Sequence, residues 1–184
     1  LFKELKPKKC YFSHDGKCSD KVIKAHSIQN NRTLKKISKN GHVVMLGFDY
    51  KNFNPLDPGI RMTEQGRKTA TTFTGFCSYH DQMLFRDIDN EDYTKSNEKQ
   101  EFLFCFRGLV FEFYKKETAK SVFEEASNSG FIENKELADL FLLGTRKSIE
   151  YLNYYFTLFK EGLETNNYNI LESVHLILDK EYLL

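Results

Sequence analysis

Hydrophobic and polar residues follow different patterns in the two halves of the chain. In the first half, short runs of β-branched and aromatic residues are separated by turn signals, a pattern typical of strands. Extended segments are therefore predicted at residues 22–28, 42–48 and 69–75. A short helix is expected at 31–39, with Leu34 and Ile37 facing inward and Asn40-Gly41 ending it.

The stretch 49–68 is rich in residues that interrupt regular structure. It holds all but one of the chain's prolines, together with several Asn, Asp and Gly residues. This composition predicts a long loop.

In the second half, apolar residues recur at three- and four-residue steps, which indicates amphipathic helices. The first helix carries Phe102, Cys105, Phe106, Leu109 and Phe113. A second is expected to begin near Asn134, and a third to cover 168–179 with His175 as a structural residue. Together they predict a helical hairpin or bundle.

Three of the four cysteines fall in two half-sites: Cys10 and Cys18 near the start, and Cys77 with His80 at the beginning of a predicted helix. Zn²⁺ prefers four sulfur and nitrogen ligands in a tetrahedron, and these four side chains supply them. His14 is a rival ligand, and Cys10 and Cys18 could instead be ordinary thiols. The fourth cysteine, Cys105, is expected in the core because it lies among phenylalanines.

Charge divides the chain as the hydrophobic pattern does. Residues 1–86 hold sixteen Lys and Arg against seven Asp and Glu, a net charge of +9, and residues 87–184 hold eleven against nineteen, a net charge of −8. A basic half favours binding to nucleic acid, although it could equally dock an acidic surface of its own chain or of a partner subunit. Cations at Lys21, Lys24, Arg32, Lys35 and Lys36 are the candidates for phosphate contacts.

The composition places the protein among packed globular chains. Of the 184 residues, 40% are hydrophobic, which argues against disorder. No run of eighteen apolar residues or signal-peptide pattern is present, so a cytoplasmic protein without membrane association is predicted. In a reducing compartment a Cys/His cluster is expected to bind metal rather than form disulfides.

The half-sites, with His26 between them, resemble the zinc-bearing HNH (ββα-metal) nucleases, including phage resolvases of the endonuclease VII kind. The chain is also similar to an uncharacterised bacterial family with Ala-His-Ser-Ile-Gln, Gly-His-Val and Thr-Phe-Thr-Gly-Phe-Cys-x-x-His-Asp, here at 25–29, 41–43 and 72–81. The resemblance covers about residues 8 to 90. It implies a zinc-stapled ββα or treble-clef-like module at 1–90 and does not reach the helical half. With the α-helical domain that the apolar periodicity predicts at 91–184, the expected fold is α+β.

The resemblance also implies roles for individual residues. His26 takes the position of the general base, and Asp81 that of the ligand to a catalytic Mg²⁺ or Mn²⁺, beside a structural zinc. The family's middle polar residue would be Asn30, Asn31 or His42.

This chain departs from the family's pattern in one place. The acidic residue that usually precedes the base is replaced by Ala25, so Gln29, Asp49 or Asp57 would have to complete the shell of the catalytic metal.

Each proposed role has a structural alternative. His26 could be a hydrogen-bonded structural histidine or a further zinc ligand. Asp81 could be present because a carboxylate is favoured in the first turn of a helix.

The sequence therefore supports two functions. The first is a metal-dependent endonuclease acting on nucleic acid, with DNA preferred to RNA, in bacterial defence or a mobile element. The alternative is a non-catalytic zinc module that binds nucleic acid or protein, with the helical half forming a homodimer.

Overall fold

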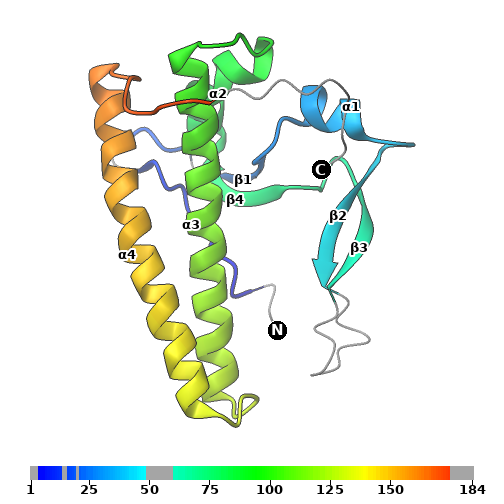
Figure 1. Cartoon of the computed structure of the whole chain (residues 1–184), viewed down its shortest axis with the longest axis vertical. Coiled ribbons are helices and arrows are strands. Elements are labelled where there is room, and N and C mark those ends of the chain that lie inside the picture. Colours follow the sequence, from blue (N-terminus) through cyan, green and yellow to red (C-terminus); the bar gives the residue numbers. More distant parts are fainter. Residues whose placement is uncertain (1–3, 14–15, 20, 49–59, 175–184) are drawn as a thin grey trace. The chain divides into compact units, whose positions relative to one another are not determined.

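The computed structural model of the chain describes residues 4–13, 16–19, 21–48 and 60–174 (Figure 1). The fold is α+β, as predicted, with short strands and a Cys/His cluster followed by long helices. The chain forms two compact units. Unit 1 comprises residues 1–25 and 73–176, and unit 2 comprises 26–72 and 177–184. The predicted domain boundary at residue 90 stays a prediction.

Unit 1 is a two-stranded sheet followed by three helices. β1 (Val22–His26) pairs with β4 (Thr72–Cys77), and β4 leads directly into α2 (Ser78–Asn90). α3 (Glu98–Asn128) and α4 (Lys135–Thr165) then form a long antiparallel hairpin, visible in green and orange in Figure 1. Asparagine caps start both long helices, because the side chains of Asn97 and Asn134 accept hydrogen bonds from the backbone three residues on.

Aromatic rings make the core of unit 1. Phe106 of α3 lies at its centre and contacts rings from the N-terminal segment, from β4, from α2 and from α4: Phe12, Phe76, Phe85, Phe156 and Phe159. Edge-on and tilted ring pairs of this kind each add about 0.5–1.5 kcal/mol beyond the area they bury. The core therefore joins the strand–helix module to the hairpin in one unit.

Unit 2 is built on a β-hairpin. β2 (His42–Phe48) pairs antiparallel with β3 (Ile60–Gly66), in a register that sets His42 opposite Gly66. Before it come one π-turn, η2 (Asn30–Leu34), and one short helical turn, α1 (Lys35–Ile37). Its buried core consists of Leu34, Val43 and Ala70, with Met45 packed against them.

Two predicted elements are wrong. The loop predicted at 49–68 contains β3, because strand pairing with β2 outweighs the polar composition of residues 60–66. The helix predicted at 168–179 is irregular over the described residues 168–174. The preceding helix, α4, ends at Thr165, because the next residue, Asn166, has a left-handed φ of 53°. Beyond it, Tyr168 and Leu171 pack on the core without forming a helix.

The prediction for Cys105 is also wrong, since its side chain is exposed. The buried apolar positions of α3 include Phe102, Leu103, Phe106, Val110, Phe113 and Tyr114, and Cys105 precedes Phe106 by one residue. One residue rotates a helix by about 100°, which takes Cys105 off the buried face. The strand expected at 69–75 and the helix expected at 31–39 exist, but the strand begins at Thr72 and the helix is shorter.

Candidate metal centre

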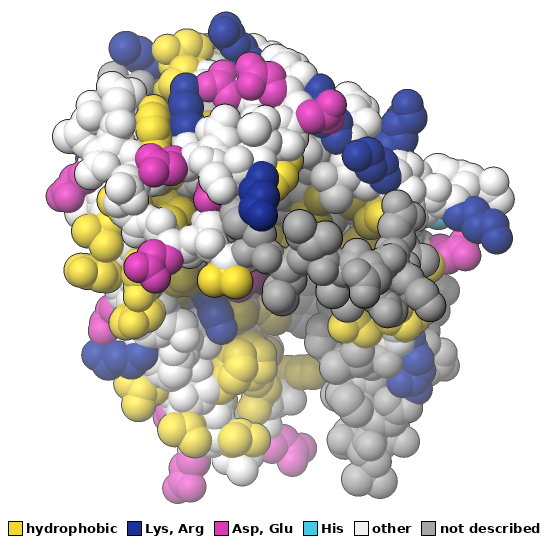
Figure 2. Space-filling view, turned by 45° about the horizontal axis from the view of Figure 1, so that its top comes forward, with side chains coloured by type: hydrophobic (Ala, Val, Ile, Leu, Met, Phe, Trp, Pro, Cys, Tyr) yellow, Lys and Arg dark blue, Asp and Glu magenta, His cyan; other side chains and the backbone are white. Residues whose placement is uncertain are grey.

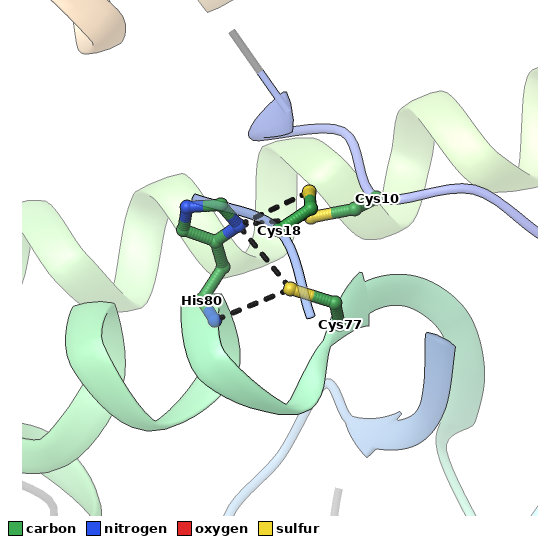
Figure 3. A group of neighbouring side chains, drawn as sticks. All are labelled: Cys10, Cys18, Cys77 and His80. Carbon is green, nitrogen blue, oxygen red and sulfur yellow. Dashed lines mark hydrogen bonds between the residues drawn. The ribbon is translucent and has the colours of Figure 1, made fainter. Parts of the chain in front are cut away.

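The centre forms where β4 passes into α2. Cys77 is the last residue of β4 and the N-cap of α2, and the backbone N–H of His80 donates to its sulfur at 3.5 Å. The strand-to-helix turn therefore fixes the spacing of the two residues, and places both side chains on the same side of the first helical turn (Figure 3).

The other two members come from the N-terminal segment, which is held against this turn. Near Cys10, the N–H of Tyr11 donates to the carbonyl of Gly75 at 3.0 Å. Near Cys18, the hydroxyl of Ser19 lies 2.9 Å from that of Ser78, and accepts a hydrogen bond from the N–H of Tyr79 at 3.4 Å. Local hydrogen bonds thus bring residues about sixty positions apart to one point.

All four candidate side chains converge. Their ligand atoms lie within 4.8 Å of one another, and Nδ1 of His80 is 3.4, 3.5 and 3.3 Å from the sulfurs of Cys10, Cys18 and Cys77 (Figure 3). A zinc ion with Zn–S bonds of about 2.3 Å and a Zn–N bond of about 2.0 Å has tetrahedral S···N edges of about 3.5 Å. The donor set and its spacing therefore fit a tetrahedral metal ion.

The half of the cluster on α2 is shielded from solvent, whereas Cys18 is exposed. Cys77 and His80 are fully buried, and the ring of Phe12 packs edge-on against that of His80 with 5.3 Å between centroids. Four protein ligands leave no open position on a tetrahedral ion, which is typical of structural rather than catalytic sites.

The thiols differ in acidity. Burial raises the pKa of Cys10, and burial together with the neighbouring Cys10 thiol raises the pKa of Cys18 to about 12. Burial also acts to raise the pKa of Cys77, but hydrogen bonds from the His80 backbone N–H and from Ser19 outweigh it and lower the pKa to about 6. Without a cation, one thiolate is therefore favoured at neutral pH and two are not.

His26, the candidate base, is the last residue of β1 and is partly buried. Its Nδ1 lies 3.1 Å from the carbonyl oxygen of Ala70. A carbonyl only accepts, so Nδ1 carries the proton, and in the neutral ring the lone pair is then on Nε2. The backbone beside it is strained, because Thr71 has φ 59°, a region that β-branched residues rarely adopt.

Asp81, the candidate ligand for a second metal, follows His80 in the first turn of α2 and is partly buried. Burial raises its pKa, although the positive charge of Arg107 acts in the opposite direction. Its Oδ1 is buried with no hydrogen-bond partner among the described residues. His26 and Asp81 belong to different units, so their meeting in one site stays a prediction.

The remaining candidates are distributed between the units. Lys21 and Lys24 are exposed in unit 1, and Lys35 and Lys36 are exposed in unit 2, where Arg32 is partly buried. His14, Asp49, Asp57 and His175 lie outside the described residues.

The other polar candidates of unit 2 are described. His42 is exposed, with Nδ1 3.0 Å from the carbonyl of Asn40. Gln29 and Asn30 each have one buried side-chain atom without a hydrogen-bond partner in the described part of the chain.

Sequence reasoning missed one polar group in unit 1. Arg107 of α3 is only 3% exposed and donates to both carboxylate oxygens of Asp89, at 2.8 and 2.7 Å, while its guanidinium lies 4.0 Å from the ring centroid of Phe85. A charged residue on the apolar face of a predicted helix was the available signal, since such a group is rarely buried without a partner.

Comparison of the chain with known protein families, curated proteins and solved structures identifies no relative: no family model, no curated protein and no solved structure matches it. No helix within the described residues has the length and apolar character needed to cross a membrane.

Proposed function

We propose that the Cys10/Cys18/Cys77/His80 cluster holds a structural zinc ion, and that the protein binds nucleic acid and hydrolyses its phosphodiester bonds with His26 as the general base. The S···N distances of 3.3–3.5 Å support the zinc assignment. Zinc would supply cross-linking of the N-terminal segment to the turn before α2, and no catalytic step is assigned to it.

Charge supports a nucleic-acid ligand for unit 2. Residues 26–72 hold eight Lys and Arg against three Asp and Glu, a net charge of +5. Unit 1 has eighteen against twenty-one, a net charge of −3. The two-stranded ribbon β2–β3 has a shape that the major groove of DNA admits. Cations of this unit flank the ribbon in the sequence, at Arg32, Lys35, Lys36, Lys39, Arg67 and Lys68, so DNA is preferred to RNA.

The observation that carries hydrolysis is the hydrogen bond from His26 Nδ1 to the carbonyl of Ala70. It fixes the tautomer in which Nε2 would accept a proton from a water that attacks phosphorus. The bond from phosphorus to the leaving sugar oxygen would break in the same reaction, and that oxygen would take up a proton from the imidazolium or from water. The strained backbone at Thr71 also supports a functional site, because residues in rarely populated backbone conformations cluster at active and ligand-binding sites.

The described residues do not fit a catalytic Mg²⁺ or Mn²⁺. Asp81 is the one carboxylate that the family's pattern offers, and it lies within the field of the Arg107 cation, with Ala25 where a second acid would stand. A hard divalent cation needs oxygen ligands and is repelled by a nearby guanidinium. The proposed hydrolysis therefore assigns no step to such an ion.

The poor fit of a catalytic divalent cation favours a second candidate function, that of a zinc module that binds nucleic acid without cleaving it. In this case Asp81 is a structural residue: its carboxylate stabilises the first turn of α2 and interacts with the positive charge of Arg107. The two candidates share the zinc and the basic unit, and they differ in whether His26 turns over substrate.

The test compares three proteins: wild type, His26→Ala and His42→Ala. His42 is a matched control, because its Nδ1 also contacts a backbone carbonyl at 3.0 Å. Supercoiled plasmid and single-stranded RNA are incubated with each protein with and without Mg²⁺ or Mn²⁺, and binding is measured separately by fluorescence anisotropy. The hydrolase proposal expects cleavage by wild type and none by His26→Ala, with binding by all three proteins; cleavage by His42→Ala would in addition exclude His42 as the middle polar residue of the site.

Binding without cleavage by any of the proteins would establish the non-catalytic module instead. Cleavage that survives in His26→Ala would remove His26 as the base. Zinc itself is tested independently, by metal analysis of the purified protein and by the thiolate charge-transfer bands of the Co²⁺-substituted form, with Cys105→Ser as the control that keeps them.

A further inference from the structure

The second long helix, α4, has two apolar faces, and only one of them is covered within the described residues. Ala138, Leu142 and Phe159 are buried against the rest of unit 1. The other face, called the outer face, consists of Leu137, Leu140, Tyr151, Tyr154 and Tyr155. Phe141 lies at its edge, where its ring also stacks on that of Phe123 of α3 with 3.7 Å between centroids. The side chains of the outer face are 37–65% exposed, and Figure 2 shows hydrophobic side chains along the outer side of the hairpin.

The outer face is long enough for a stable interface. From Leu137 to Leu158 the helix rises by about 32 Å. With about 200 Å² for each large side chain and the exposed fractions above, the face offers about 700 Å² of apolar area. A stable pair of proteins buries about 800 Å² on each partner, whereas a monomer rarely exposes an apolar patch of this size without a function.

We infer that the outer face binds the same face of a second copy of this chain, antiparallel and about a two-fold axis near Ser148. This goes beyond the proposed function and does not depend on it. In an antiparallel pair, each column of a helix meets the same column of the other helix. Around residues 147 and 148 this register brings apolar residues together on both sides of the axis, as Leu137 with Leu158, Leu140 with Tyr154 and Phe141 with Tyr155, while Lys147 and Ser148 lie at the axis itself.

Shape also fits this register. Gly144 meets Tyr151 of the second copy, which sets the smallest residue of the column against a large one. A Cβ added at Gly144 would have no atom within 4 Å, so the surface over this glycine is open. Twice in each dimer, a tyrosine ring would therefore fill the space that the missing side chain leaves.

Charge at the axis is balanced within each copy. Lys147, which meets its own symmetry copy in the column of Leu140 and Tyr154, forms an ion pair of 2.8 Å with Glu150 of the same chain. The two-fold axis therefore brings together two neutral pairs rather than two uncompensated cations.

The first test is the mass of the protein in solution, measured by light scattering and by sedimentation equilibrium. Wild type is expected to be a dimer, and Tyr151→Glu a monomer with an unchanged helical circular dichroism spectrum. Asn153→Glu is the matched control, because Asn153 is exposed on α4 but lies outside the outer face, and it is expected to remain a dimer. A monomeric wild type, or dimers of equal strength in both variants, would overturn the proposal.

The second test determines the register by disulfide trapping, in metal-loaded protein with Cys105→Ser as the background. Ser148→Cys is expected to form a cross-linked dimer with itself on mild oxidation, since it lies on the axis. Leu137→Cys is expected to cross-link only when mixed with Leu158→Cys. Self-cross-linking by Leu137→Cys would indicate a parallel pair, and absence of any cross-link would mean that another molecule covers the face; either result overturns the proposal.

Discussion

Among the described residues, unit 1 packs more than ten buried aromatic and aliphatic side chains in one core and carries the Cys3His cluster, whereas unit 2 has a core of three buried apolar residues, Leu34, Val43 and Ala70. Their charges differ as well, at −3 for unit 1 and +5 for residues 26–72. Concentrated positive charge opposes compaction, and a small core offers little to offset it. We therefore expect unit 1 to be the more stable of the two, while unit 2 carries the positive charge on which the proposed binding of nucleic acid depends.

The difference between the units is tested most strongly by removing a ligand of the cluster. Cys77→Ser keeps a good helix cap, because serine is a preferred N-cap residue, and removes one thiolate. We expect unit 1 to lose its cooperative thermal transition, since structural zinc sites contribute on the order of 10 kcal/mol to folding. Circular dichroism melting measures the effect, with the exposed Cys105→Ser as the control, expected to lie within about 0.5 kcal/mol of wild type.

Amide hydrogen exchange then separates the units. In Cys77→Ser, protection is expected to be lost in α2 and α3, while the β2–β3 hairpin changes less. Equal loss in both units would show that the two fold as one, with no difference in stability between them.

The next largest effect is expected from Arg107, whose side chain is buried although its partner Asp89 is 40% exposed. Arg107→Ala leaves Asp89 to water and opens a space above Phe85, which should lower the free energy of unfolding by about 2–3 kcal/mol, mainly through lost packing. The control is Lys115→Ala, which breaks an exposed ion pair with Glu112 and should cost less than about 1 kcal/mol. Chemical denaturation measures both. Similar losses in the free energy of unfolding for the two variants would mean that the burial of Arg107 does not add to the stability of unit 1.

Metal binding should depend steeply on pH. At pH 7 the metal-free protein holds protons on Cys10 and Cys18, whose pKa values are raised, but not on Cys77, whose pKa is about 6. Binding as thiolates then releases about two protons, so affinity should rise about 100-fold per pH unit, or about 2.7 kcal/mol, and fall as the pH is lowered.

Calorimetry in buffers of different ionisation enthalpy counts these protons directly. Release of three at pH 7 would mean that Cys77 is also protonated in the metal-free protein. Release of none would show that the cysteines are not the ligands.

The smallest predicted effect belongs to unit 2. Thr71 has a left-handed backbone, and asparagine tolerates that conformation better than a β-branched residue does. Thr71→Asn should therefore stabilise unit 2 by about 1 kcal/mol. The measurement is amide hydrogen exchange in β2 and β3 as the temperature is raised. A destabilised variant would mean that contacts of the threonine side chain stabilise the fold by more than its backbone strain destabilises it.

Residue chemistry and local spacing were enough to predict much of this fold. β2 begins and ends at the predicted residues 42 and 48, and both helices of the hairpin follow their apolar periodicity. The Cys3His cluster was predicted because only a few side chain types bind zinc, although the pairs are about sixty residues apart.

What could not be predicted depends on partners distant in the chain. β3 has a polar sequence and becomes a strand only because β2 pairs with it. The contact of Arg107 with Asp89 joins two helices across eighteen positions, which no local pattern reveals. The position of Cys105 was wrong because apolar neighbours indicate an apolar face without telling where its edge lies.

The long separation between the half-sites has a consequence for how the protein is made. Cys18 leaves the ribosome sixty-two residues before His80. At about 5–20 residues per second, the first two thiols therefore wait about 3–12 s before the other ligands exist. During that interval they are open to oxidation and to capture by other metals, so a cell must keep the nascent chain reduced until the turn before α2 has been synthesised.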